Sequence, residues 1–353
     1  MRVKTIIILL VCCFVHLALL SAQAGPAILQ HRYSFNETTG TVVPDLVGGA
    51  AWDAAIAGPD VSWYWTTNAA GSGELYLPQG VGTGNGTTTG NYIDLPNFIL
   101  SSMTNYSSNI TFEAWFTWTD SRWDGTGLAQ PWFRLFEMGN VSLNLADEGN
   151  TPGTRSSFIS QIRRGDAAHA LSMEDRISGG LTWVVSDGQL ATNQPYYIAI
   201  TYDVSGGLCQ IYTNGVFAAG RTNTLAALDS VYPDYNCWLG RSQFPDNPTF
   251  SGLWNEFRMW SGILSAAEIA DHFSAGPDGF VARPSLNIDA SGSNVIVSWP
   301  TNNSVGFNLN AKATVGTAGG WLPVTPSATV VGNNYQVTLP HTNAARFFQL
   351  SNP

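Results

Sequence analysis

The stretch that decides the fold runs from Phe250 to Gly276 and reads FSGLWNEFRMWSGILSAAEIADHFSAG. From Phe257 onward its first part nearly alternates apolar and polar residues, which is the pattern of a half-buried strand. Ser265-Ala-Ala-Glu268 follows as a capping box, in which the Ser side chain accepts from the Glu268 amide and Glu268 reaches back. Gly276 can take the left-handed conformation that ends a helix. The stretch therefore predicts one strand followed by one short helix.

The rest of the chain is dominated by short apolar and aromatic runs that turn residues separate. Gly accounts for 36 of the 353 residues, and only 11% of the residues are charged. Asn214-Gly215, directly after one run, is a strong hairpin signal. Many short strands joined by such turns are typical of a β-sandwich or barrel. The runs predict strands at Leu29–Phe35, Asn91–Leu95, Ile110–Trp118, Phe133–Met138, Ser157–Arg163, Leu181–Val185, Tyr196–Tyr202, Leu208–Thr213, Cys237–Gly240 and Asn255–Trp260.

The N-terminus has the pattern of a secretory signal. Arg2 and Lys4 precede an apolar run over residues 5–20, and Ala22-Gln23-Ala24 suits a cleavage site. The run is short for a membrane span, although a retained anchor is the alternative. We therefore expect residues 1–24 to be a signal peptide. The mature protein is then secreted, extracellular or periplasmic, with no membrane segment.

The charge of the mature chain excludes one class of partner. Losing Arg2 and Lys4, with no acid, takes the formal net charge from −10 to −12 and leaves Lys312 as the one lysine. Nucleic-acid binding needs a basic surface that displaces counterions, and no basic stripe exists here. The same acidity disfavours anionic lipid surfaces, so we expect neither nucleic acid nor membrane as a partner.

A domain boundary is indicated near residues 277–284. Beyond it the pattern restarts with short alternating segments such as NVIVSW and NYQVTLP. Their length suits a small sandwich of the fibronectin type III or immunoglobulin kind, with Trp299 and Trp321 in its core. We predict a large β domain over residues 25–280 and a small β-sandwich over residues 281–353.

Four segments of the large domain, taken in order, carry a family resemblance. They are HRYSFN (31–36) with DLVGG (45–49), YIDL (92–95) with TFEAWFTW (111–118), YIAITYD (197–203) with QIYTNG (210–215), and WLGRS (238–242) leading into the strand and helix quoted first. The ordered set resembles the laminin G-like (LamG) domains of the concanavalin A-like family. The resemblance implies an all-β jelly-roll sandwich of two antiparallel sheets, which commonly binds carbohydrate or protein ligands.

The resemblance also implies a structural calcium ion. The positions that match the family's calcium site are Asn36, the turn from Asp45 to Gly49, and Asn255. Asn255 is a departure, because Asp is usual there and the loss of a carboxylate weakens a calcium site. The alternative is that these polar groups only cap turns.

Cys209 and Cys237 are the two cysteines that remain after signal cleavage, and both fall in predicted strands. Secretion permits a disulfide between them. The alternative is two buried thiols that behave as small apolar residues.

The acidic residues do not form a recognisable active site, so we predict a protein that is not an enzyme. Retaining glycoside hydrolysis needs two carboxylates about 5 Å apart, as when acids alternate along one strand. Glu113 and Glu137 each stand without an acidic partner on their strands. The pairs Asp147-Glu148 and Glu174-Asp175 lie in sequence typical of solvated turns. Acids on different strands remain the alternative route to a hydrolase.

Aromatic residues near turns are the candidate binding residues. Exposed aromatic faces stack on sugar rings, and flanking polar groups bind hydroxyls. Trp115, Trp118, Trp254 and Trp260 are expected to be structural instead. The candidates are Trp63, Trp65, Asp120, Arg122, Trp123, Asp124 and Trp132.

Three functional hypotheses follow from these patterns. The first is a secreted, non-catalytic lectin-like protein that recognises a polysaccharide or a cell-surface glycan. The second is an adhesion protein whose ligand is another protein, which an exposed apolar patch would favour. The third is a glycan-active hydrolase whose acids come from separate strands.

Overall fold

A computed structural model describes residues 27–59, 62–78, 90–119, 132–140, 156–164, 170–178, 180–244, 247–279, 284, 286–301, 307–314, 320–342 and 345–351. For residues 181–186 only the backbone is described. The predicted signal peptide lies outside these residues. Within the described part, none of the helices is both long enough and apolar enough to span a bilayer.

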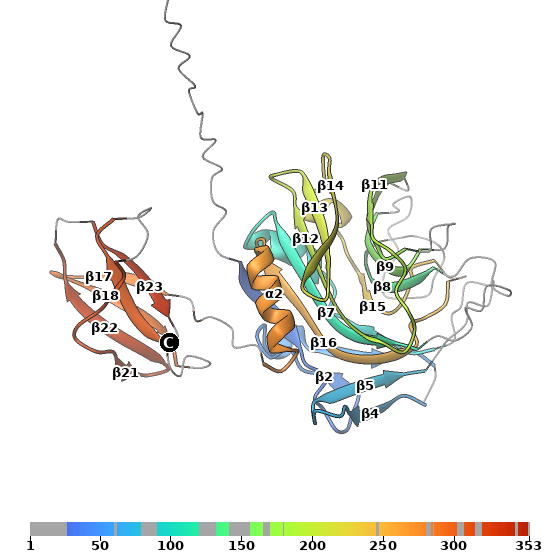
Figure 1. The fold of residues 1–353 in the computed structure, drawn as a ribbon, viewed down its shortest axis with the longest axis horizontal. Coiled ribbons are helices and arrows are strands. Elements are labelled where there is room, and N and C mark those ends of the chain that lie inside the picture. The colour runs from blue at the N-terminus through green and yellow to red at the C-terminus, as the bar shows by residue number, and fades with distance from the viewer. Residues whose placement is uncertain are drawn as a thin grey trace, which may run out of the picture.

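Two antiparallel sheets of eight strands each form the body of the protein (Figure 1). The first sheet has the order β14 (Val216–Thr222), β13 (Leu208–Thr213), β12 (Pro195–Asp203), β7 (Ile110–Trp118), β16 (Gly252–Ser261), β5 (Gly73–Leu77) and β4 (Tyr64–Thr67), with β1 (Ile28–Tyr33) paired to β16. The second has the order β11 (Gly180–Ser186), β10 (Ser172–Ile177), β9 (Ser157–Arg163), β8 (Phe133–Gly139), β15 (Asn236–Leu239), β6 (Tyr92–Asp94), β3 (Ala54–Ala57) and β2 (Val42–Val43). This architecture confirms the predicted all-β jelly-roll sandwich.

The main core lies between the two sheets, and strand periodicity places it there. Along β7, Phe112, Ala114 and Phe116 face the core, while the residues between them face away. Phe112 meets Phe136 of the second sheet with ring centroids 4.6 Å apart. The four tryptophans expected to be structural, Trp115, Trp118, Trp254 and Trp260, are all buried.

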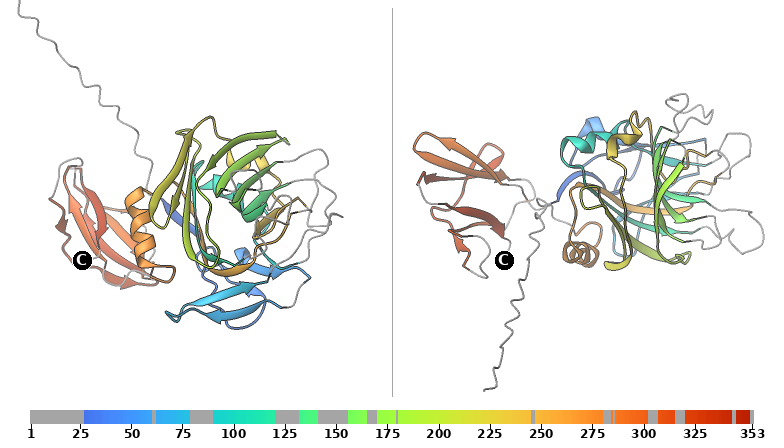
Figure 2. Two further views of the ribbon diagram at one scale, coloured as in Figure 1. Left: turned by 45° about the vertical axis from the view of Figure 1, so that its right-hand side comes forward. Right: turned by 90° about the horizontal axis from the view of Figure 1, so that it is seen from above.

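The outer face of the first sheet packs against helix α2 (Ala266–Ala275) (Figures 1 and 2). The helix begins at Ser265 and ends before Gly276, and both arms of the predicted capping box are present. Ile269 of the helix is fully buried, in one cluster with Trp260 and Tyr197 of the sheet. The short helices α1 (Ile99–Ser102), η1 (Ala50–Trp52), η2 (Met103–Asn105) and η3 (Leu228–Val231) lie in the connections.

A buried carboxylate ties this helix to the sheet. Glu113 of β7 is fully buried and accepts from Tyr197 Oη at 2.5 Å and Trp260 Nε1 at 2.6 Å. His272 Nδ1 of α2 lies 2.8 Å from the same carboxylate, and Arg258 Nη1 lies 3.6 Å from it. Burial alone would raise the pKa of Glu113, but the hydrogen bond with His272, the charge of Arg258 and the Tyr197 hydroxyl hold it below its ordinary value.

Beyond α2, the C-terminal strands form two sheets of their own. One has the order β17 (Asn287–Ser291), β18 (Asn294–Pro300), β22 (Asn334–Pro340) and β21 (Thr329–Val331). The other has the order β20 (Leu322–Pro323), β19 (Asn308–Lys312) and β23 (Phe347–Ser351). They fit a small β-sandwich, with Trp299 buried in its core, whereas Trp321 is half-buried and outside that core. The domain boundaries and the fibronectin-like identity stay predictions.

All ten predicted strands of the large domain are present, but the sequence analysis missed β2, β3, β4, β5, β10 and β14. One prediction about β10 was wrong, because Glu174 and Asp175 are buried in a strand and not in a solvated turn. Asp175 occupies a core-facing position, where it accepts from Tyr202 Oη at 2.7 Å. That polar residue interrupts the apolar alternation by which a strand is recognised. The pair Asp147-Glu148 lies outside the described residues.

The predicted disulfide is not formed. Cys209 and Cys237 are both free, buried thiols. Cys209 belongs to β13 of the first sheet and Cys237 to β15 of the second. Cys237 Sγ instead donates to Asp234 O at 3.3 Å, so the second interpretation, two thiols that behave as small apolar residues, describes them.

Candidate functional site

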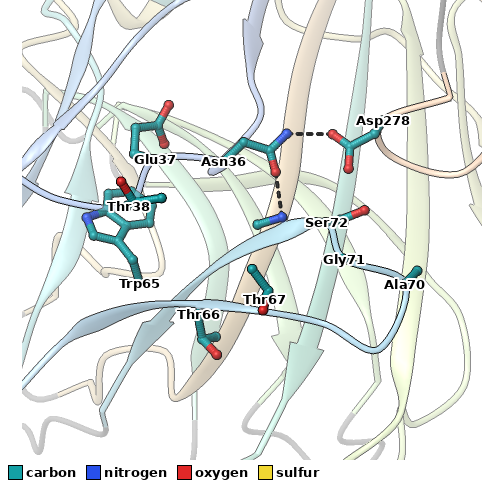
Figure 3. Close-up of a pocket in the computed structure, with 11 residues that line it drawn as sticks. Asn36, Glu37, Thr38, Trp65, Thr66, Thr67, Ala70, Gly71, Ser72 and Asp278 are labelled. Carbon is teal, nitrogen blue, oxygen red and sulfur yellow. Dashed lines mark hydrogen bonds between the residues drawn. The ribbon is translucent and has the colours of Figure 1, made fainter.

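An open pocket of about 670 Å³ lies beside the edge strand β4 of the first sheet (Figure 3). Three segments far apart in the chain line it: the turn after β1, strand β4 with its following turn, and the segment after α2. We call it the Trp65 pocket. Its lining residues are Asn36, Glu37, Thr38, Trp65, Thr66, Thr67, Ala70, Gly71, Ser72, Gly73 and Asp278.

Asn36 joins these three segments. Its Nδ2 donates to Asp278 Oδ1 at 2.6 Å, and its Oδ1 accepts from the Gly73 amide at 2.6 Å (Figure 3). A Cβ on Gly73 would lie 2.5 Å from Asn36 Cα, so only glycine allows this close approach. Because α2 ends three residues earlier, the helix that the sequence predicted also sets where Asp278 lies.

The turn between β4 and β5 forms a second wall of the pocket. Asn68 Oδ1 accepts from the amides of Ala70 at 2.9 Å and Ser72 at 3.0 Å, which is the side-chain geometry that asparagine supplies in tight turns. Gly71 has a positive φ of 86°, a conformation that residues with a Cβ rarely adopt. The backbone of this wall is therefore held before any ligand arrives.

Trp65 supplies the one aromatic ring of the described lining. It is half-buried, and its Nε1 donates to Gly40 O at 3.0 Å, which fixes the plane of the indole. Trp63 packs edge-on against it, with ring centroids 6.4 Å apart. The structure thus places two predicted binding residues together, with Trp65 lining the pocket and Trp63 supporting it.

The charges of the described lining are all negative. Glu37 and Asp278 are its only charged residues, and the rest of the described lining is the Trp65 indole with hydroxyl, amide and small groups. Glu37 Oε2 is a buried atom with no hydrogen-bond partner. Burial raises the pKa of Glu37; a hydrogen bond with its own backbone opposes this, and the nearby Asp53 adds to the rise. This oxygen is closed to solvent, so Glu37 contributes negative charge to the pocket without offering Oε2 to a ligand.

The three predicted calcium ligands are not brought together as one site. Asp45 Oδ1 accepts from the amides of Arg32, Val47 and Gly48, and its Oδ2 lies 2.6 Å from His31 Nδ1. Its oxygens are thus already occupied, so Asp45 does not fit a calcium ligand.

Asn255 suits the role of a calcium ligand better than Asp45 does. Its Oδ1 is buried without a hydrogen-bond partner, while its Nδ2 donates to Gly73 O and Glu74 Oε1, each at 3.3 Å. Asn36 contacts the same glycine from the other side. The described residues contain no group of three or more His, Cys, Asp or Glu side chains able to hold a metal. Any calcium at Asn255 would have to rely on amide and backbone oxygens and on Glu74.

A second cluster lies on the outer face of the second sheet. Glu137 of β8 and Glu174 of β10 are both opposite Ile159 of β9, so the three stand in one row. Two strand spacings separate the glutamates, roughly 10 Å between main chains. We call this cluster the acid–arginine face; its members are Arg134, Glu137, Gln161, Arg164, Glu174 and Arg176.

Hydrogen bonds link the two glutamates of the acid–arginine face through Arg134 and Gln161. Arg134 Nε donates to Glu137 Oε2 at 2.6 Å, and Arg134 Nη1 donates to Gln161 Oε1 at 2.8 Å. Gln161 Nε2 in turn donates to Glu174 Oε1 at 2.5 Å, and Arg164 Nε donates to the same oxygen at 2.7 Å. Both glutamates are fully buried. Each carboxylate therefore forms a buried ion pair with an arginine, which is a structural role.

Trp132 lies at the rim of this face. Arg164 stacks over its ring at 5.8 Å, and Arg134 Nη1 donates to its backbone carbonyl at 3.3 Å. The structure therefore separates Trp132 from Trp63 and Trp65. The other predicted binding residues, Asp120, Arg122, Trp123 and Asp124, lie outside the described residues.

Sequence reasoning missed most of the Trp65 pocket. Glu37, Asp278 and the threonines of β4 were not candidates, because each is unremarkable within its own segment. The motif SFNETTG (34–40) was the one available signal, since Asn36 and Glu37 follow the first strand. Glu137 and Glu174 were missed as a pair because β9 lies between them.

Comparisons with known proteins place this geometry in context. A family model described as the concanavalin A-like lectin/glucanases superfamily matches residues 85–270. No curated protein sequence matches the chain.

Solved structures with similar folds share little sequence with the chain. One is domain 4 of AbnA, an extracellular arabinanase from Geobacillus stearothermophilus, in complex with arabinotriose. It is 18% identical, with a TM-score of 0.45, over 69% of this chain and 98% of that chain. Another is the CBM40 of a Ruminococcus gnavus sialidase bound to α2,3-sialyllactose. It is 13% identical, with a TM-score of 0.38, over 51% and 95% of the two chains. A Trypanosoma rangeli sialidase is 16% identical, with a TM-score of 0.43, over 70% of this chain and 33% of its own.

Proposed function

Because this chain belongs to the concanavalin A-like lectin/glucanases superfamily, we propose that it is a secreted, non-catalytic protein that binds a glycan in the Trp65 pocket. The observation that carries the proposal is the half-buried indole of Trp65 in an open pocket with hydroxyl, amide and carboxylate groups around it. The pocket residues lie outside the matched range 85–270, so this assignment rests on geometry.

The composition of the pocket suits a sugar. A pyranose ring has an apolar face that packs on an indole, and equatorial hydroxyls that need hydrogen-bond partners. Asn36, Asp278 and Thr67 present such partners at the exposed side of the pocket. The open shape favours a chain-like polysaccharide or cell-surface glycan that lies across the β4 edge.

A non-catalytic role is supported by the state of the buried acids. A hydrolase needs one carboxylic acid that gives up a proton and a second carboxylate near the sugar. Glu137 and Glu174 are fully buried, and arginine donates to each of them. Both carboxylates form ion pairs with arginine, and neither lines the Trp65 pocket.

The protein-binding alternative has one observation in its favour. Val216 and Phe217 at the tip of the β13–β14 hairpin are 68% and 53% exposed, and Phe273 of α2 is 43% exposed. The hairpin tip lies against the helix, because a Cβ on Gly215 would be 3.0 Å from the Phe273 side chain. Contiguous exposed apolar side chains are typical of protein contacts. Concentration-dependent self-association that Phe217→Ser abolishes would support this alternative.

The test of the glycan proposal compares Trp65→Ala with Tyr64→Ala. Tyr64 is the neighbouring aromatic of β4, 52% exposed and stacked on Tyr76, so it controls for losing a ring from this strand. We expect Trp65→Ala to weaken retention on native polysaccharide gels roughly tenfold, about 1.4 kcal/mol. Tyr64→Ala should bind as the parent protein does. Equal binding by both variants, with circular dichroism showing both folded, would remove the pocket from the proposal.

A further inference from the structure

The Trp65 pocket carries a charge preference that goes beyond sugar binding in general. Its described lining holds two carboxylates, Glu37 and Asp278, and neither lysine nor arginine. A carboxylated or sulfated sugar would place like charges close together in this pocket, which is unfavourable. The pocket therefore selects against acidic glycans.

The nearby cation does not neutralise the pocket. Arg32 is close enough to Asp278 for the two charges to interact. However, Arg32 Nε and Nη2 donate to Glu256 at 2.8 and 3.1 Å, and Arg32 Nη2 also donates to Pro277 O. The guanidinium of Arg32 is thus paired with Glu256. The carboxylate of Asp278 accepts a hydrogen bond from the neutral amide of Asn36 across 2.6 Å.

Glu37 has the stronger need for a nearby positive charge. Its Oε2 is buried with no hydrogen-bond partner, and an unsatisfied buried carboxylate oxygen costs more than a neutral one. The charge of Asp53 acts on Glu37 in the same unfavourable direction. An ammonium group in the pocket would supply the opposite charge.

We propose that the Trp65 pocket binds a glycan that carries free amino groups, with an ammonium group paired to Glu37 and Asp278. Trp65 contributes to the same selectivity, because an indole face attracts a cation as well as a sugar ring. The ligand class is a polymer or oligomer of hexosamine that is at least partly free of N-acetyl groups. This inference rests on the proposed glycan-binding function and names its ligand.

The test measures affinity by titration calorimetry on the whole mature protein, at a pH where the amino groups are protonated. The probes are glucosamine oligosaccharides, the same oligosaccharides N-acetylated, and galacturonic acid oligosaccharides of equal length. We expect the free amines to bind about five- to tenfold more tightly than the N-acetylated form, and the acidic oligosaccharides not to bind measurably.

Two isosteric variants test whether Glu37 and Asp278 cause the preference for free amines. Glu37→Gln and Asp278→Asn should each reduce the preference for the free amine towards equality, while binding of the N-acetylated form is retained. Asp229→Asn removes one charge at an exposed position of η3, away from the pocket, and should leave the preference unchanged. Added salt should weaken the amine complex more than the N-acetylated one.

Each outcome separates this inference from the proposed function. Equal affinity for the amine and N-acetylated forms, or tighter binding of galacturonate, overturns the inference and leaves glycan binding intact. Tighter binding of a lysine-rich peptide than of glucosamine oligosaccharides also overturns it, in favour of a protein ligand. Failure of every oligosaccharide and polysaccharide to bind removes the proposed function itself.

Discussion

Asn36 donates a hydrogen bond to Asp278 across 2.6 Å, although 242 positions of chain separate the two residues. The same side chain accepts a hydrogen bond from the Gly73 amide. One side-chain amide therefore connects the turn after β1, the β4–β5 hairpin and the segment after α2. The Trp65 pocket exists because these three segments meet there. Its shape depends on the whole large domain being folded.

Removing this amide should loosen the pocket. We predict that Asn36→Ala lowers the free energy of unfolding by about 1–2 kcal/mol, since two hydrogen bonds are lost at an exposed position. Glycan affinity should fall as well, because Asp278 and the Gly73 backbone lose their common partner. Urea unfolding and calorimetric titration measure the two effects. Asn193→Ala, at an exposed turn outside the pocket, is the control, and an equal loss of affinity in it would contradict the prediction.

The buried carboxylate under α2 should make stability depend on pH. Because the pKa of Glu113 is held below its ordinary value of 4.5, its contribution is present above that pH and is lost as pH falls through the folded-state value. Glu113→Gln should lower the free energy of unfolding by about 3 kcal/mol at neutral pH. The variant should also lose less stability than the parent below pH 4.5. Parallel acid curves for the two proteins would contradict this linkage.

The acid–arginine face should contribute to stability and not to activity. Glu137→Gln leaves Arg134 without its charged partner, and we expect a loss of about 2–3 kcal/mol in the free energy of unfolding. Binding of glycan at the Trp65 pocket should stay unchanged. Release of reducing sugar by the parent protein that this variant lacks would instead establish a hydrolase, the third hypothesis drawn from the sequence.

Both thiols should be unreactive in the folded protein. Burial raises the pKa of Cys209 and of Cys237 well above the ordinary thiol value, and no disulfide joins them. We predict that iodoacetamide modifies neither residue until the protein is unfolded, as mass spectrometry will show. A reductant should leave the melting temperature unchanged. A fall in melting temperature with reductant would restore the predicted disulfide.

The calcium prediction can be tested at Asn255, where the family usually has Asp. Asn255→Asp places a carboxylate beside Glu74, to which the Asn255 amide now donates at 3.3 Å. Without calcium the variant should melt at a lower temperature than the parent, because two buried carboxylates repel each other. Calcium should restore the lost stability, since carboxylates are its preferred ligands. If calcium and chelator give the same melting curve in both proteins, the site does not exist.

Local patterns were sufficient for most of the fold. Alternation along segments such as Ile110–Trp118 identified ten strands, and the Ser265–Glu268 capping box located α2. Two of the missed strands, β10 and β14, escaped detection for different reasons. Asp175 of β10 faces the core of the sandwich and interrupts the apolar alternation of that strand. β14 is an edge strand with mostly exposed side chains. The alternation of apolar and polar residues identifies a strand only when one face of the strand is buried and that face is apolar.

The sequence by itself determined the all-β class, the order of most strands, the helix and the aromatic residues worth testing, because each of these depends on neighbours a few positions apart. Only the tertiary structure decided which strands lie side by side. It placed Glu137 and Glu174 in one row, put Cys209 and Cys237 on different sheets, and brought Asn36 to Asp278. Strand neighbours are set by how the apolar faces of both sheets pack as a whole, and no local pattern contains that information.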